Sequence, residues 1–216
     1  RASMLDRFTW FRQSAFLWRG DGLTVYIDPW GVTTDDKADV LFITHAHYDH
    51  FSQDDIEKVR KQGTRIFAPA DVARELTGNV TPVKPGDSID VGGVKAQAVP
   101  AYNTAEERLE AHPKKNNWVG YILTLGANTY YHAGDTDHAP ELSRVRADVA
   151  FLPIGGTYTM DAPEAAEMAK ALEPKLAVPM HFGFVVGTPS DAERFAKEAD
   201  PIKVQILEPT NPFEKE

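Results

Sequence analysis

The chain of 216 residues contains no cysteine. Disulfide bonds, thiolate zinc sites and cysteine nucleophiles are therefore excluded, so any metal must be bound by His, Asp, Glu or Asn side chains. The absence of cysteine also fits a reducing compartment, and we expect a cytoplasmic protein. No apolar run approaches the roughly 18 residues that a membrane span needs, and no apolar segment follows the charged N-terminus, so we expect neither a membrane partner nor a secretory signal.

Positive charge is scarce as well: the chain has 23 Lys and Arg residues but 32 Asp and Glu residues, which gives a formal net charge of -9. Phosphate backbones are bound by basic surfaces, so this balance argues against nucleic acid and favours a small-molecule substrate. The chain also lacks a G-x-S-x-G serine and a glycine-rich phosphate loop. These absences argue against a serine hydrolase and against nucleotide-driven chemistry. The sequence gives no indication of the oligomeric state.

The order of apolar runs and capping patterns predicts an α/β fold with mixed β-sheets. Helices are expected over 52–62 and 161–172, near 72–76, and from Ser190 with Glu193 as its capping-box partner. Residues 103–117 have no clear period and are expected to form a loop. With no repeat or linker, we expect one domain over residues 1–216. Strands are predicted at 23–27, 38–44, 65–68, 88–91, 94–99, 118–125, 129–132, 147–154, 175–181 and 203–207.

Polar side chains of the types that bind metals come directly after five of these strands. If the five strand ends meet at one rim, they form a polar pocket on a rigid scaffold, where binding and catalysis are usually found. The residues, in chain order, are Asp28, His45, His47, Asp49, His50, Asn103, Asp135, Asp137 and His181.

The sequence Thr-His-Ala-His-Tyr-Asp-His at residues 44–50 is the strongest of these signals. Alternation along an extended backbone puts His45 and His47 on one side, where both imidazoles can reach one ion. Asp49 and His50 follow after a bend and can address a second ion. Neutral imidazole and carboxylate suit zinc, manganese or iron(II), and an ion that lacks one protein ligand keeps a position for water.

This His-x-His-x-Asp-His pattern after an apolar strand resembles the signature of the metallo-β-lactamase superfamily. The chain is similar to its small bacterial and archaeal hydrolases, which are related to ascorbate-6-phosphate lactonase and, more distantly, to the phospholipase that cleaves N-acyl phosphatidylethanolamine. The similarity extends over nearly the whole chain. The other matching phrases are YIDPW (26–30), VPAYN (99–103), WVGYI (118–122), YHAGDT (131–136), LPIGGT (152–157) and VPMH (178–181).

The resemblance implies a four-layer αββα sandwich with a site for two metal ions, most readily zinc. It implies that His45 and His47 bind the first ion, and that Asp135 bridges the two ions. Asp49, His50 and His181 would bind the second ion. From the residues alone, Asp135 reads equally as a turn residue and His181 as a hydrogen-bonded histidine at a strand end.

One position departs from the family pattern. Most members have a histidine, the third ligand of the first ion, after the strand that here ends at residue 99, and this chain has Asn103 there. Asn103 could supply an amide oxygen, His112 could replace it from the following loop, or the first site could lack a ligand. We predict His112, with a mononuclear enzyme as a further alternative.

The remaining polar residues suggest supporting roles. Asp28 is expected to orient a ligand histidine through its second ring nitrogen, and Asp137 could do the same. For His132 and His138, hydrogen bonding within their own turn competes with a role beside the metal. Residues expected to line a substrate pocket are Tyr102, Thr157, Tyr158 and Phe182.

The reaction expected is hydrolysis by a metal-bound hydroxide, oriented by Asp49, on a lactone or other ester or on a phosphodiester. Two alternatives remain from other classes. One is a protein that binds metal, as a sensor for example, without turnover. The other is an RNA-processing nuclease, which the negative charge disfavours.

Overall fold

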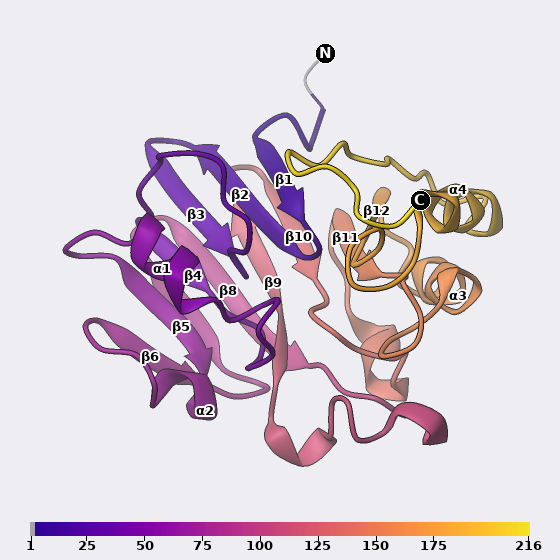
Figure 1. The fold of residues 1–216 in the computed structure, drawn as a ribbon, viewed down its shortest axis with the longest axis horizontal. Helices are drawn as coiled ribbons and strands as arrows, with labels where there is room; N and C mark the ends of the chain where they lie inside the picture. Colours follow the sequence, from indigo (N-terminus) through magenta and orange to yellow (C-terminus); the bar gives the residue numbers. More distant parts are fainter. Residues whose placement is uncertain (1–2) are drawn as a thin grey trace. The chain divides into compact units, whose positions relative to one another are not determined.

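A computed structural model describes residues 3–216 of the chain, which divide into two compact units. Unit 1 contains residues up to 83 together with 208–212, and unit 2 contains residues 84–207 together with 213–216. Each unit is built around one six-stranded mixed sheet with helices (Figure 1). The prediction of an α/β fold with mixed sheets is therefore confirmed.

The sheet of unit 1 follows the chain in the order β1-β2-β3-β4-β5-β6. The first three strands pair antiparallel and the last four pair parallel. Parallel neighbours place their carboxyl ends at the same edge, and β1 runs in the direction of β3, so the residues after β1, β3 and β4 share that edge. The strands are β1 (Phe8–Arg12), β2 (Ala15–Gly20), β3 (Leu23–Ile27), β4 (Val40–Phe42), β5 (Arg65–Pro69) and β6 (Val80–Val83).

Two short helices, α1 (Gln53–Val59) and α2 (Ala70–Ala73), complete unit 1 (Figure 1). Ser52 caps α1 by accepting a hydrogen bond from the Asp55 amide, as its sequence predicts. Ile56 of α1 and Val72 of α2 are fully buried in one apolar cluster with side chains of the strands. Because the helices and strands pack in one cluster, the residues that follow the strands are held by a closely packed layer.

The sheet of unit 2 has the order β12-β11-β10-β9-β8-β7. Strands β7 to β10 pair antiparallel, and β10, β11 and β12 pair parallel. The segments that follow β8, β10, β11 and β12 therefore leave the sheet at one edge. The strands are β7 (Ser88–Val91), β8 (Val94–Pro100), β9 (Val119–Leu125), β10 (Asn128–His132), β11 (Val149–Pro153) and β12 (Leu176–Met180).

Helices α3 (Ala162–Leu172) and α4 (Pro189–Glu198) pack against each other beside β11 and β12 (Figure 1). Asp161 begins α3 with a capping box, as predicted. The predicted cap of α4 is wrong: Thr188 and Asp191 form the capping box instead of Ser190 and Glu193, because Pro189 fits the first turn and the cap lies two residues earlier.

Two further sequence predictions differ from the structure. The strand predicted at 203–207 is reduced to one isolated bridge between Ala177 and Val204. The loop predicted at 103–117 contains two single 3-10 turns, η1 (Glu106–Arg108) and η2 (Lys114–Asn116), and η3 (Pro140–Arg144) follows β10. Among residues 3–216, no helix combines the length and the apolar character that crossing a membrane requires.

Candidate functional site

The histidine cluster of unit 1 is shaped by a tight turn directly after β4. The amides of His50 and Phe51 both donate to the carbonyl of His47, at 2.9 and 2.8 Å. This turn brings His50 back beside His45, with ring centroids 4.1 Å apart, and the rings of His45 and His47 are 4.8 Å apart. Three imidazoles from six consecutive residues are therefore gathered at the carboxyl edge of the sheet.

Asp28, which follows β3, stabilises this cluster through hydrogen bonds. It is fully buried, and its Oδ2 accepts hydrogen bonds from His50 Nδ1 at 2.8 Å and from the Thr44 hydroxyl at 2.6 Å. Its Oδ1 accepts the Thr44 amide at 2.8 Å. Since the Thr44 hydroxyl donates its proton to Asp28, it accepts from His45 Nδ1, which lies 2.8 Å away.

These hydrogen bonds determine the tautomers of two histidines. In a neutral imidazole only one nitrogen carries a proton, and here that nitrogen is Nδ1 in both His45 and His50. The lone pair of each ring is therefore on Nε2, the form in which a histidine binds a metal. Ligand atoms of Asp28, His45 and His50 lie within 4.8 Å of one another. Because Asp28 is engaged with the Nδ1 side, its place is that of an orienting residue, as its sequence position predicts.

Asp49 is held by a residue that the sequence did not suggest. Gln13, in the turn between β1 and β2, is fully buried with a left-handed backbone (φ 53°), and its amide nitrogen donates to Asp49 Oδ2 at 2.8 Å. The same oxygen lies 3.5 Å from His50 Nε2. A buried glutamine with positive φ is uncommon, and such conformations concentrate at functional sites.

The polar cluster of unit 2 centres on Asp135, which follows β10 and is almost fully buried. Its Oδ2 lies 3.1 Å from Nε2 of His112 and 3.1 Å from Nε2 of His181. His112 comes from the loop after β8, and His181 comes directly after β12. Both imidazoles are buried, so residues far apart in the sequence meet at one carboxylate oxygen.

Asn103 lies behind His112 in the same unit. Its Oδ1 is 2.8 Å from His112 Nδ1, and its Nδ2 donates to the carbonyl of Tyr158 at 3.0 Å. Since an amide oxygen can only accept, Nδ1 of His112 carries the proton and the lone pair of the neutral ring is on Nε2. That lone pair faces the Asp135 carboxylate oxygen, an arrangement that a cation between them satisfies. The donor set of unit 2 thus fits a metal ion.

The loop that carries His112 is anchored by Asp137, which is buried. Its Oδ2 accepts the amides of Thr104 and Ala105 at 2.8 and 3.0 Å, and its Oδ1 accepts Arg108 Nε at 2.8 Å. Arg108 in turn donates to Glu164 Oε2 at 2.9 Å. Asp137 therefore binds two backbone amides and an arginine side chain. The sequence had suggested that it could instead orient a ligand histidine.

Two further histidines of unit 2 are engaged locally. His132 Nδ1 accepts the amide of Gly134 at 3.2 Å, and its ring stacks on Phe151. His138 Nε2 lies 2.8 Å from the Ser143 hydroxyl, and burial lowers the pKa of His138. The contact of His132 lies within the turn, as considered for this residue, whereas the partner of His138 lies in η3, beyond that turn.

The turn after β12 holds His181 in a left-handed conformation, with φ of 61°. Its carbonyl is so close to Gly155 that a Cβ there would lie 2.3 Å from the oxygen. Gly183 follows with φ of 84°, and a Cβ on it would lie 2.3 Å from the ring of Phe213. The left-handed turn at His181 is therefore packed against Gly155, and Gly183 two residues later is packed against Phe213.

The residues predicted to line a substrate pocket differ in accessibility. Thr157 and Tyr158 are exposed, Tyr158 by 47%, whereas Phe182 is fully buried against Phe213. Tyr102 is buried and donates to Glu141 Oε1 at 2.6 Å. Burial raises the pKa of Tyr102 to about 12, and the Glu141 carboxylate contributes to the rise. Of these four residues, Thr157 and Tyr158 are the two that are open for contact with a ligand.

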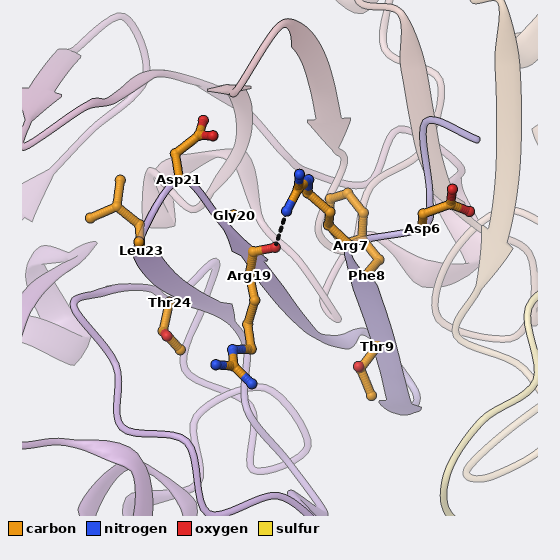
Figure 2. Close-up of a pocket in the computed structure, with 10 residues that line it drawn as sticks. Asp6, Arg7, Phe8, Thr9, Arg19, Gly20, Asp21, Leu23 and Thr24 are labelled. Carbon is orange, nitrogen blue, oxygen red and sulfur yellow. Dashed lines mark hydrogen bonds between the residues drawn. The ribbon is translucent and has the colours of Figure 1, made fainter. Parts of the chain in front are cut away.

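Unit 1 also has a polar pocket of about 570 Å³, shown in Figure 2. It is lined by the start of β1, the end of β2 and the start of β3, with Arg7 donating to the carbonyl of Arg19. The histidine cluster follows the opposite ends of β3 and β4. Charges of both signs, from Asp6 and Asp21 as well as the arginines, line the pocket, so it does not favour one class of ligand.

Comparisons with known proteins agree on one family. The model of the β-lactamase superfamily domain matches residues 7–181. A UPF0173 metal-dependent hydrolase of Methanopyrus kandleri is 31% identical, over 97% of this chain and 100% of the relative. A solved structure from Parabacteroides distasonis, named as a metal-dependent hydrolase, is 33% identical with a TM-score of 0.82, covering 94% of this chain and 93% of that one. A metallo hydrolase of Ignicoccus hospitalis is 27% identical with a TM-score of 0.76, covering 94% and 95%.

Proposed function

This chain belongs to the metallo-β-lactamase superfamily and is a metal-dependent hydrolase, and we propose that it uses two metal ions, most readily zinc, to hydrolyse an ester, lactone or phosphodiester bond of a small molecule. The proposed ligands are those expected from the sequence, with His112 in place of Asn103. They are His45, His47, Asp49, His50, His112, Asp135 and His181.

The observation that carries the proposal is the placement of an oxygen acceptor at Nδ1 of three buried imidazoles. His45, His50 and His112 each direct Nδ1–H toward an oxygen acceptor, which leaves Nε2 as the donor atom for a cation. Acceptors that fix several tautomers in the same sense are typical of ligand histidines. Histidines that only fill a core need no such common orientation.

When bound, a metal ion lowers the pKa of a water molecule from 15.7 to about 7 and polarises a carbonyl or phosphoryl oxygen. Asp49 supports this chemistry as the proposed proton acceptor, because Gln13 keeps one of its oxygens in a fixed position. Asp28 supports it by keeping His50 and, through Thr44, His45 in the ligand tautomer.

A small uncharged or weakly anionic substrate is favoured by the charge of the chain, which is -9. Lys114, two residues after His112 in the same loop, lies over the ring of Tyr102 and 3.7 Å from Glu141. Its charge is thus partly compensated. We therefore place lactones and other esters first and phosphodiesters second.

The test is hydrolysis by the zinc-loaded protein of two substrates, a simple γ-lactone and a bis-aryl phosphodiester. We expect turnover of at least one, with kcat/KM reduced by about 100-fold or more in His47→Ala, because a metal ligand is lost. His138→Ala is the matched control, since this histidine contacts Ser143 outside both clusters, and it is expected to retain activity.

Other outcomes assign the protein to another class. If neither substrate is hydrolysed and His47→Ala changes only the metal content, the protein is a metal-binding protein without turnover. If single-stranded RNA is cleaved while both small substrates remain intact, the protein is a nuclease.

A further inference from the structure

We propose that Asn103 is a positioning residue, which holds His112 in the tautomer that binds the metal and so allows a loop histidine to serve at this position. The inference rests on the proposed metal site. It concerns how the chain compensates for the absence of a histidine directly after β8.

The orientation of the Asn103 side chain is fixed by two hydrogen bonds, one in which its amide nitrogen donates and one in which its amide oxygen accepts. Its Nδ2 donates to the Tyr158 carbonyl at 3.0 Å, so its Oδ1 is the atom that faces His112 Nδ1 at 2.8 Å. Reversing the amide would place oxygen against the Tyr158 carbonyl and an N–H₂ group against His112. Since Asn103 is 3% exposed, water has little access to repair such a mismatch.

The backbone supports the same pairing. The amide of Asn103 donates to the carbonyl of His112 at 2.9 Å, so the two residues are joined by main chain as well as by side chains. Between them, the amides of Thr104 and Ala105 and the side chain of Arg108 are held by Asp137. The loop therefore presents His112 at a fixed place, and Asn103 sets which nitrogen carries the proton.

Asparagine suits this position because it offers one donor and one acceptor on a short side chain. Leucine has a similar volume but would leave both the Tyr158 carbonyl and His112 Nδ1 without this partner. Removing the residue that hydrogen-bonds a ligand histidine typically weakens metal binding by about 10–100-fold. We expect a loss of this size when Asn103 is replaced by an apolar residue.

The test uses the full chain loaded with zinc and two measurements that do not depend on turnover. Zinc affinity is measured by competition with a chelator, and the Nδ1–H proton of His112 is followed by NMR after assignment through His112→Gln. For Asn103→Leu we expect a Kd about 10–100-fold higher and an Nδ1–H signal shifted from its wild-type position, because the proton has lost its acceptor. Asn128→Leu is the matched control, because Asn128 lies at the start of β10 and its side chain donates to the hydroxyl of Tyr130, at 3.5 Å.

Asn103→Asp keeps an acceptor toward His112 but loses the donor to the Tyr158 carbonyl, so it tests the contact with His112 separately from the contact with Tyr158. We expect it to keep the Nδ1–H signal of His112 near its wild-type position, although the protein is less stable than the wild type. The inference is overturned if Asn103→Leu binds zinc like the wild type, or if Asn103→Asp changes the Nδ1–H signal as Asn103→Leu does. Loss of zinc affinity in a protein that hydrolyses no substrate would support the inference while the proposed function fails.

Discussion

The two units orient their histidines with different acceptors. In unit 1 a single buried carboxylate, Asp28, serves His50 directly and His45 through Thr44. In unit 2 a neutral amide, Asn103, serves His112 alone and is itself held by the Tyr158 carbonyl. The carboxylate of Asp28 makes stronger hydrogen bonds, to His50 and to the Thr44 hydroxyl, than the neutral amide of Asn103 makes to His112.

This difference indicates which substitutions should affect each cluster most. The histidines of unit 1 come from one turn and depend on one residue behind them. Those of unit 2 come from separate loops, and each depends on the packing of its own loop. Damage at Asp28 should therefore affect several ligands, whereas damage in unit 2 should affect one ligand at a time.

The largest effect is expected for Asp28→Asn. Asparagine tolerates the left-handed backbone of this residue (φ 47°), but one of its oxygens becomes an N–H₂ group that faces the donors of Thr44 or His50. We expect the free energy of unfolding to fall by about 2–4 kcal/mol and zinc affinity to fall by about 10–100-fold. Denaturant titration and chelator competition measure these quantities. A smaller loss of zinc affinity than in Asn103→Leu would contradict the comparison.

Gly155→Ala comes next, because its Cβ would lie 2.3 Å from the carbonyl oxygen of His181. We expect a loss of about 1–3 kcal/mol in the free energy of unfolding and weaker zinc binding, since the turn that holds His181 must move. Gly86→Ala serves as the control: φ there is +96° and the space is open, so stability falls while zinc binding stays unchanged. Equal zinc affinity in the two variants would show that the His181 turn does not depend on Gly155.

Tyr102 provides a pH-dependent prediction within unit 2. Burial raises its pKa to about 12, from 10.0 in the unfolded chain. Between these values the unfolded state loses a proton that the folded state keeps, so this contribution to stability is complete below pH 10 and is lost as the pH rises toward 12. The stability advantage of the wild type over Tyr102→Phe should therefore shrink over this range, as thermal unfolding at several pH values can measure. A constant difference would contradict the assignment.

The smallest effect is expected for Asp161→Ala, which removes the cap of α3. Asp161 accepts the amide of Glu164 at 2.9 Å, and loss of such a cap costs about 1 kcal/mol. Zinc affinity should not change, because the cap contacts none of the proposed ligands. If zinc affinity falls here as it does in Asp28→Asn, reduced stability alone would account for both results.

The sequence predicted the fold class and the family, and both are confirmed. It was most informative at residues 44–50, because their chemistry is contiguous and follows an apolar strand. It did not predict β1, β2 or β6 as strands. The run of β2 is largely buried on both faces, and the buried residues of β1 are adjacent, so neither strand shows the alternation of an exposed strand. β6 is short, with Pro82 inside it.

The supporting residues were harder to predict. Gln13 and Arg108 have no signal of their own in the sequence, because each acts through a contact with a residue distant in the chain. Thr44 lies in the 44–50 motif, but its role as a hydrogen-bond relay depends on Asp28, which follows another strand. For Asn103 the sequence left open whether it binds the metal, and the structure places it against His112. The roles of the ligands and the single domain over residues 1–216 stay predictions.

The central claim is tested most directly by the zinc content per chain of the wild type, His47→Ala and Asp135→Ala, after dialysis to remove loosely bound ions. We predict two equivalents in the wild type and one or none in each variant, with all three proteins folded by circular dichroism. A wild type that retains no zinc, manganese or iron, or variants that retain the wild-type content, would contradict the account.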